Sequence, residues 1–289
     1  MSADRNAVSR GFPPPGGTRG TSEADTGVRV RIRSLTSLED CNACVALQRE
    51  VWGDISDIVP AALLHVVDFV GGIAAGAFDA DGTMLGFVFG MSGIHDGELA
   101  HWSHMLGVRD SARNHGVGRL LKEYQRRMLG EIGVRRIFWT FDPLMSKNAY
   151  FNLNRLGAVV VEYVPDMYGA TASPLHLGLP TDRLIVCLTT VVQPTAVPLA
   201  VGDDLPVMTP FPQPGDRTLA AGDDRPATVL VEMPADILDE VTRAPARAAT
   251  WRLALRERFQ WALSQAYTPR AVHRNATAGR FFYVMQRGV

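Results

Sequence analysis

Residues 113–118 combine a basic side chain with glycines in a spacing that could hold an anion. They read Arg-Asn-His-Gly-Val-Gly and follow an apolar run that ends at Val108. From Val117 onward, apolar residues recur at intervals of three and four, which predicts a helix to about residue 131. Glycines at the start of a helix leave its first backbone N–H groups accessible. Because the aligned peptide dipoles favour negative charge there by roughly 0.3–2 kcal/mol, the spacing predicts a phosphate-binding turn.

Two classes of ligand fit such a turn, a dinucleotide and an acyl-carrying coenzyme. A dinucleotide fold needs Gly-x-Gly-x-x-Gly and an acidic residue about 20 residues further on. Gly116 and Gly118 supply the first two glycines, but Leu121 stands where the third belongs, and only Asp142 fits the acidic position. A nicotinamide-dependent oxidoreductase is therefore the weaker alternative. Four basic side chains are expected to add positive charge around the turn, namely Arg109, Arg113, Arg119 and Lys122.

The turn resembles the Arg/Gln-x-x-Gly-x-Gly/Ala signature of the GNAT acyl-CoA acyltransferases, through Arg113, Gly116 and Gly118. In that family the turn holds the pyrophosphate of coenzyme A, so the resemblance implies acetyl-CoA or another acyl-CoA as co-substrate and no metal. It also implies transfer of the acyl group, with acetyl expected first, to the primary amine of a small molecule. Arg183 and Tyr168 could bind a carboxylate, which favours an amino-acid-like acceptor. The residues that the resemblance places at the coenzyme are Leu106, Val108, Arg113, Asn114, His115, Gly116, Val117, Gly118, Arg119 and Asn148.

A second block extends the resemblance to the next helix of the family, usually written Asn-x-x-Ala-x-x-Leu-Tyr-x-x-x-Gly-Phe. Ala149 and Gly157 carry it here, with Ser146 in the asparagine position. Leu153 occupies the position of the tyrosine that usually protonates the departing thiolate, so Tyr150, Ser146 or solvent would have to replace it. This departure leaves a second alternative open, a GNAT-like regulatory module that binds coenzyme A without turnover.

The residue that best suits the role of general base is His104. Counting back in twos from Val108, along the strand expected at 99–108, places His104 on the face of Leu106, because strand side chains alternate. An imidazole titrates near neutrality, which suits removal of a proton from an ammonium group. Asp142, directly after the next strand, is interpreted either as a second polar group of the acceptor site or as a cap for the following helix.

Periodicity along the chain predicts an α/β fold with a mixed sheet. Residues 28–191 give the order strand, helix, helix, three strands, helix, strand, helix and two strands, with an Asp-Gly hairpin at 81–82 inside an antiparallel meander. This is the order of the GNAT fold, so the resemblance covers these residues as one acyltransferase domain. The stretch 139–144 and the pair at 182–183 are similar to a poorly characterised bacterial GNAT-like subgroup with a C-terminal extension. Residues 1–27 are expected to be a disordered tail.

The C-terminal part of the chain is expected to be an extension joined by a linker. Residues 192–226 contain seven prolines, which predicts an irregular linker. Residues 227–289 predict a strand, a helix and a strand, and four apolar residues are stacked along the helix: Trp251, Leu255, Phe259 and Leu263. Such a unit cannot bury its own core and should dock on the N-terminal sheet or on another subunit. The arginines of this helix, Arg252 and Arg256 among them, are expected on a solvated face.

Charge and composition exclude several classes of partner. The 289 residues carry 29 basic and 30 acidic side chains, a formal net charge of −1, so no attraction to nucleic acid or to anionic lipid is expected. Cys41 and Cys44 form one Cys-x-x-Cys pair without a second, which favours small buried helix residues over a zinc site. No secretory leader or membrane span is expected, which predicts a cytoplasmic protein. The protein is expected to act as a monomer or homodimer.

Overall fold

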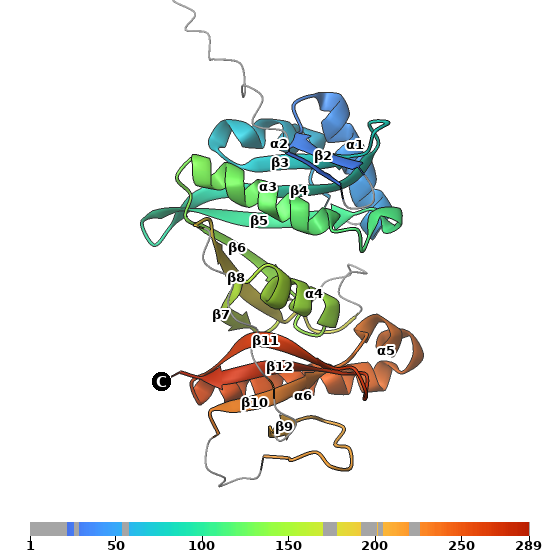
Figure 1. Ribbon diagram of the computed structural model, residues 1–289, viewed down its shortest axis with the longest axis vertical. Helices are drawn as coiled ribbons and strands as arrows, with labels where there is room; N and C mark the ends of the chain where they lie inside the picture. Colours follow the sequence, from blue (N-terminus) through green and yellow to red (C-terminus); the bar gives the residue numbers. More distant parts are fainter. Residues whose placement is uncertain are drawn as a thin grey trace, which may run out of the picture.

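The computed structural model describes residues 22–25, 29–53, 58–169, 178–191, 201, 205–219 and 226–288. Figure 1 shows an N-terminal unit built on a large sheet and, below it, a smaller C-terminal unit built on a second sheet. Within the described residues the large sheet has eight strands and the second sheet has four. The predicted α/β fold with a mixed sheet is confirmed, because the large sheet contains both antiparallel and parallel neighbours.

The strands of the large sheet lie in the spatial order β1-β2-β3-β4-β5-β6-β8-β7. Their bounds are β1 Ser22–Asp25, β2 Arg29–Ser34, β3 Ile73–Phe78, β4 Met84–His95, β5 Glu98–Val108, β6 Arg136–Phe141, β7 Val159–Val164 and β8 Arg183–Thr189. Strands β3, β4 and β5 form the predicted antiparallel meander, and β5 and β6 run parallel. Strand β1 pairs with β2 inside the segment that was expected to be a tail, which corrects that expectation for residues 22–25. The other residues of the expected tail, 1–21 and 26–27, lie outside the described residues.

Helices cover both faces of the large sheet (Figure 1). The helices of this unit are α1 Leu38–Trp52, α2 Ala61–Val66, α3 Val117–Glu131 and α4 Ser146–Tyr150. Phe87 and Phe89 of β4 pack in one cluster with α1 and α2, whereas Val88 packs with Leu121 and Tyr124 of α3 in the other. Because successive strand residues point to opposite sides, these clusters define an α1 face and an α3 face of the sheet.

Helix α4 is shorter than the helix predicted over 143–156. Asp142 Oδ1 accepts a hydrogen bond from the backbone N–H two residues further on, at 2.8 Å, and this turn delays the start of the helix to Ser146. The backbone then continues as a π-helical turn, Phe151–Arg155, in which side chains no longer follow the α-helical count. Leu153, which the resemblance in sequence aligns with a tyrosine, lies in this turn and is buried.

The C-terminal unit contains more elements than the predicted strand, helix and strand. Its elements are β9 Val207–Met208, β10 Thr228–Met233, α5 Ile237–Arg243, α6 Pro245–Ser264, β11 Tyr267–Asn275 and β12 Arg280–Arg287. Helix α5 was missed although Asp236 caps it, accepting hydrogen bonds from two backbone N–H groups of its first turn. Strand β11 was missed because Pro269 lies within it, next to a shift in the register with β12, and this breaks the alternation of a regular strand.

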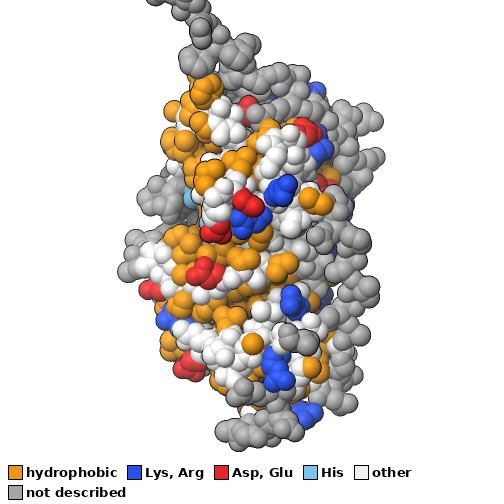
Figure 2. All heavy atoms as spheres, turned by 90° about the vertical axis from the view of Figure 1, so that its left-hand side faces the viewer, with side chains coloured by type: hydrophobic (Ala, Val, Ile, Leu, Met, Phe, Trp, Pro, Cys, Tyr) orange, Lys and Arg blue, Asp and Glu red, His pale blue; other side chains and the backbone are white. Residues whose placement is uncertain are grey.

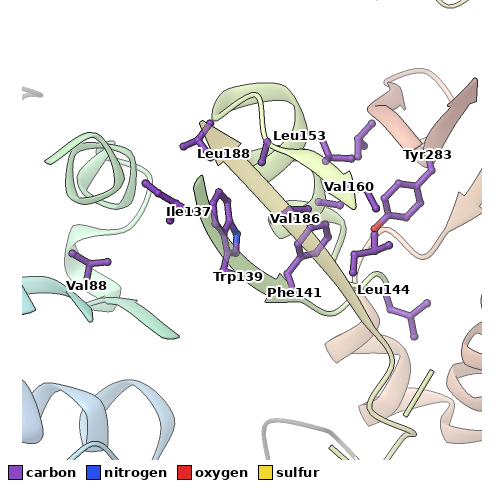
Figure 3. Close-up of a cluster of buried hydrophobic side chains, with 14 of the residues drawn as sticks. Val88, Ile137, Trp139, Phe141, Leu144, Leu153, Val160, Val186, Leu188 and Tyr283 are labelled. Carbon is purple, nitrogen blue, oxygen red and sulfur yellow. The ribbon is translucent and has the colours of Figure 1, made fainter. Parts of the chain in front are cut away.

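The C-terminal unit docks on the N-terminal unit through one hydrophobic core, as the apolar stripe of its helix predicts. Three residues of that stripe are buried in the core that both units share: Trp251, Leu255 and Phe259. Figure 3 shows the junction, where Tyr283 of β12 points toward Leu144 and Val160 of the N-terminal unit. The Tyr283 hydroxyl also donates a hydrogen bond to the carbonyl oxygen of Pro143 at 2.7 Å. The extension is therefore part of the folded body.

Candidate functional site

The parallel strands β5 and β6 pair over three residues and then part. Their partners are Ala100–Arg136, His101–Ile137 and Trp102–Phe138. Beyond Trp102, β5 stays paired with β4 as far as Val108, whereas β6 stays paired with β8 as far as Phe141. We call the opening between the two strands the wedge. Among the described residues, the edge of β5 that faces the wedge has no strand partner beyond Trp102, so its backbone N–H and C=O groups suit an extended ligand.

The predicted phosphate-binding turn lies beside the wedge. Gly116 has φ of 77° and precedes α3, whose first backbone hydrogen bond, from Leu120 N–H to Gly116 O, spans 3.1 Å. The N–H groups of the intervening residues therefore point out of the start of the helix. A methyl group built at Gly118 would lie 3.5 Å from Leu106 and 3.8 Å from Val108. The structure thus brings the predicted turn and the predicted strand contacts together.

Most predicted polar contacts of the coenzyme are exposed. The side chains or backbone of Arg113, Asn114, His115 and Gly116 lie at the surface of the turn, and Arg119 and Asn148 are exposed on α3 and α4. Arg113 pairs with Asp110 at 2.8 Å, and Arg119 with Glu123 at 3.4 Å. Surface pairs of this kind contribute little stability, so these guanidinium groups can turn toward a phosphate. Their contact with the coenzyme stays a prediction.

Lys122 does not belong to this group, which corrects the sequence prediction. It is 5% exposed, and its Nζ donates to Ser103 Oγ on β5 at 2.7 Å and to Gln125 Oε1 at 3.3 Å. The same Nζ lies 3.9 Å from the ring centre of Trp139 on β6. Ser103 and Trp139 each follow the last β5–β6 pair, so Lys122 lies at the closed end of the wedge. Burial lowers the pKa of Lys122 to about 7.

A chain of hydrogen bonds continues from Lys122 into the sheet. Gln125 Nε2 lies 3.1 Å from His101 Nε2, and His101 Nδ1 lies 3.0 Å from Ser92 Oγ. Burial, followed by the charge of Lys122, lowers the pKa of His101 to about 3, so this imidazole is neutral at ordinary pH. The amide of Gln125 then donates to Nε2, and Nδ1–H donates to Ser92. Gly118, Lys122 and Gln125 are four and three residues apart, so they lie on one face of α3. This spacing is the signal in the sequence from which the buried polar face could have been found.

His104 lies on the face of the sheet opposite to the one that was predicted. Phe89 pairs with Met105 and Gly90 with Ser103, so His104 is the extra residue of a β-bulge. The bulge reverses the alternation, because Ser103 faces Lys122 of α3 while Leu106 packs again with the α3 cluster. The His104 ring instead lies edge-on to Phe89, on the α1 face, with ring centres 6.1 Å apart. The premise of a face shared with Leu106 is wrong, and the role of His104 as a base stays a prediction.

The two candidate acids of α4 have different surroundings. Ser146 is buried, and its hydroxyl donates to the carbonyl oxygen of Ala235 in the C-terminal unit at 2.6 Å. This contact assigns Ser146 to the junction of the units and not to the wedge. Tyr150 is partly exposed, and the guanidinium of Arg155 lies 5.5 Å from its ring centre. Tyr150 therefore stays the predicted acid.

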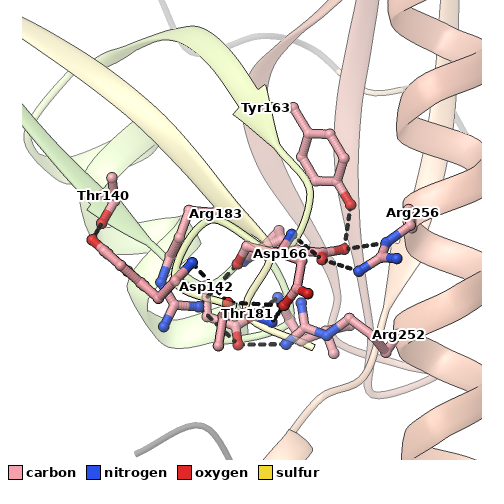
Figure 4. Close-up of polar contacts among 12 residues, drawn as sticks. Thr140, Asp142, Tyr163, Asp166, Thr181, Arg183, Arg252 and Arg256 are labelled. Carbon is pink, nitrogen blue, oxygen red and sulfur yellow. Dashed lines mark hydrogen bonds and ion pairs between the residues drawn. The ribbon is translucent and has the colours of Figure 1, made fainter. Parts of the chain in front are cut away.

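Two carboxylates at the end of β6 and just before β8 are held by α6 (Figure 4). Asp142 Oδ2 accepts from Arg252 Nη2 at 2.5 Å and lies 3.5 Å from Arg183 Nη1. Asp182 accepts from Arg256 Nε at 3.0 Å and also from its Nη2. Arg252 is only 1% exposed, and Arg256 is half-buried and pairs with the buried Asp182, so the predicted solvated face is wrong for both arginines. Asp142 joins the two units in this way, and this pairing disfavours its predicted place in the acceptor site.

A pocket of about 340 Å³ lies beside the closed end of the wedge. Trp102 and Phe138, the last paired residues of β5 and β6, line it together with residues of the β4–β5 hairpin, of β7 and of β8. Figure 2 shows the side of the molecule that this hairpin reaches in Figure 1, where hydrophobic side chains gather with a few charged ones between them. Sequence reasoning missed the pocket, because its walls come from strands that are distant in the chain.

The described part of the chain gives little support to a redox-active cysteine pair, a metal site or a membrane span. Cys41 and Cys44 are buried as predicted, and burial raises the pKa of Cys44 to about 12, which makes the thiol unreactive. No three His, Cys, Asp or Glu side chains among the described residues are grouped to hold a metal ion. The described helices also include none that is long and apolar enough to cross a membrane.

Comparison with known proteins finds similarity in structure but not in sequence. No protein-family model and no curated protein sequence matches the chain. The ribosomal-protein-S18-alanine N-acetyltransferase from Escherichia coli is similar over 59% of this chain and 99% of its own, with 15% identity and a TM-score of 0.45. A GNAT-family acetyltransferase from Streptococcus pneumoniae covers 55% and 99%, with 17% identity and a TM-score of 0.45. YncA from Salmonella typhimurium, solved with its cofactor acetyl-CoA, covers 60% and 99%, with 17% identity and a TM-score of 0.45.

Proposed function

We propose that the chain is an N-acyltransferase that moves an acyl group, acetyl first of all, from an acyl-CoA to the primary amine of a small molecule. The observation that carries the proposal is the position of the glycine turn beside the wedge, next to Leu106 and Val108. A pyrophosphate at the start of α3 is stabilised by the free N–H groups and the helix dipole. From there the pantetheine arm reaches the unpaired edge of β5 as an added strand.

The wedge suits acyl transfer because it offers polar backbone groups at a fixed place. N–H groups along the unpaired edge of β5 can hydrogen-bond the thioester oxygen as negative charge develops on it. His104 takes a proton from the ammonium group of the acceptor, and the free amine attacks the carbonyl carbon. The C–N bond forms, the C–S bond breaks, and Tyr150 protonates the departing thiolate. The second proton of the acceptor nitrogen leaves by way of solvent and reprotonates Tyr150. The bulge helps this assignment, because it brings His104 to the face that also carries the pocket.

A second candidate function is a coenzyme A-binding module without turnover. It is favoured by Leu153, which is buried in the tyrosine position, and by the tight pairing of Asp142 with Arg252. Steady-state release of the coenzyme thiol with a panel of amines separates the two functions. Release above the rate of hydrolysis supports the transferase, and binding of coenzyme A without release supports the module.

Two variants at one position test where the coenzyme phosphates bind. Gly118→Ala adds a methyl group at ordinary contact distances from Leu106 and Val108, so it should keep both the fold and coenzyme A affinity. Gly118→Asp places a carboxylate where the pyrophosphate is proposed to lie and should lower affinity at least about 100-fold, since like charges repel at short range. Titration calorimetry measures both. Equal affinity of the two folded variants would place the phosphates elsewhere.

A further inference from the structure

The pocket beside the wedge has the lining and the size of a binding site for a small apolar group. Its side-chain walls are mostly aliphatic or aromatic: Met91, Ile94, Trp102, Phe138, Val161 and Ile185. Its volume of about 340 Å³ is at the lower end of the range of small-molecule sites. A body of one or two rings, or a chain of several carbons, fits this volume. An oligosaccharide or a folded peptide segment exceeds it.

The pocket opens on the face where an acceptor would meet the acyl group. His101 bonds to α3, so its neighbour Trp102 points to the α1 face, and Phe138 points there too because Trp139 contacts Lys122 of α3. His104, two residues beyond Trp102, also lies on the α1 face. The pocket and the proposed base are therefore neighbours along β5, on one side of the sheet.

One carboxylate among the residues that line the pocket stands at the level where the strands part. Glu162 of β7 is in register with Ile185 of β8, which is in register with Thr140 of β6. Thr140 is two residues beyond Phe138, the last partner of β5. Glu162 is exposed and forms no ion pair with any described residue.

The other ionisable side chains around the pocket are already paired or neutral. His95 lies 3.2 Å from Asp96 and edge-on to Phe138, at the hairpin end. Burial keeps His101 neutral, as described above. Glu162 is therefore the available partner for a cation, and it stands at the end of the pocket that is nearer to the wedge.

We propose that the acceptor is a primary amine carried on a compact apolar body, an arylalkylamine or a medium-chain alkylamine. The body packs between Trp102, Phe138 and Ile185, and the ammonium group is drawn toward Glu162. His104 then removes one proton, and the amine attacks the thioester as set out above. The inference rests on the proposed transferase function and names its substrate class. A second ammonium or several hydroxyl groups on the body would lose water against apolar walls without a partner.

A panel of amines with acetyl-CoA tests the class. The acceptors are 2-phenylethylamine and hexylamine on one side, and putrescine and glucosamine on the other. We expect kcat/KM to be at least about tenfold higher for the first two, because a missing apolar contact of this size changes the ratio by that much or more. Faster turnover of putrescine or glucosamine would overturn the inference and leave the transferase function standing.

Variants connect the preference to the pocket. Glu162→Gln should raise KM for 2-phenylethylamine about fivefold, in line with the loss of one exposed charge pair, and leave coenzyme A affinity unchanged. Glu131→Gln, an exposed carboxylate at the end of α3, is the matched control and should change neither. Phe138→Leu should reduce the preference for 2-phenylethylamine over putrescine while keeping hexylamine active. An unchanged KM in Glu162→Gln and an unchanged preference in Phe138→Leu would together refute the site.

A binding measurement keeps the test independent of turnover. If coenzyme A binds but no amine releases thiol, the transferase proposal fails. Titration of 2-phenylethylamine followed by NMR then decides the inference on its own, with saturable shifts expected in the parent and weakened in Glu162→Gln. Absence of saturable binding to the parent protein, with coenzyme A present, would overturn it.

Discussion

Replacing Lys122 by methionine should remove a pH dependence from the stability of the fold. Burial lowers the pKa of this lysine to about 7 in the folded chain, whereas the unfolded chain keeps the ordinary value of 10.5. Between these pH values the unfolded chain binds a proton that the folded chain does not. Raising the pH therefore favours the folded state, and the gain is complete only above the unfolded value.

The size of the effect follows from the same two values. Each unit of pH in this interval is worth up to about 1.4 kcal/mol, so the free energy of unfolding should rise by roughly 2–3 kcal/mol between pH 7.5 and 9.5. Lys122→Met keeps the length of the side chain but loses this gain. It also leaves Ser103 Oγ and Gln125 Oε1 without their donor, which costs about 1–3 kcal/mol for each buried group at every pH. Only the pH-dependent part of the loss in stability identifies Lys122 as a buried ionisable group.

The assay is urea unfolding at pH 7.5, 8.5 and 9.5 for the parent, Lys122→Met and Lys147→Met. Lys147 is the matched control, because it is the other lysine of the chain and its side chain is 85% exposed. The parent and Lys147→Met should gain stability together as the pH rises, and Lys122→Met should fall behind them. Since the chain has two lysines, ¹⁵N NMR of labelled lysine can follow the Lys122 titration directly. Parallel curves for all three proteins would refute the reasoning.

Three further perturbations probe the base and the junction of the units. His104→Ala should lower kcat by about 10²–10⁴ with coenzyme A affinity unchanged; full activity would make water the base. Arg252→Ala should cost about 3–5 kcal/mol in urea unfolding, because it removes a buried guanidinium and leaves half-buried Asp142 without its main partner, whereas Arg243→Ala at an exposed pair should cost under about 0.5 kcal/mol; equal losses would contradict the assignment. A chain that ends at residue 191 should be insoluble or much less stable, because it exposes the core shared with Phe259; an unchanged melting temperature would show that the core is not shared.

The helices and strands of the N-terminal unit could be predicted because burial imposes a period on the sequence. In α3 the apolar spacing from Val117 onward marks the face that packs on the sheet, and Gly116 and Gly118 at its start mark the turn. Ser37, whose hydroxyl accepts from the N–H of Asp40, marks the start of α1 in the same way. These signals are local, so they survive in the sequence alone.

The site itself depends on features that have no local signal. A bulge adds a residue without disturbing the alternation on either side of it, so counting in twos across His104 reaches the wrong face. The burial of Arg252 depends on Asp142, 110 residues away, and the sequence does not show that the two will meet. Lys122 shares this difficulty, although its spacing from Gly118 could have placed it on the buried side of α3.

The wedge also decides how the molecule divides mechanically. Within the large sheet, the half that ends at β5 is joined to the half that begins at β6 by a ladder of three residue pairs. The second half is held far more extensively by the C-terminal unit, through Asp142, Asp182 and the core around Tyr283 (Figures 3 and 4). The division of the contacts is thus not the division into two units along the sequence. Because β6 and β8 are tied to the C-terminal unit, we expect any change in the width of the wedge to move these strands together with that unit.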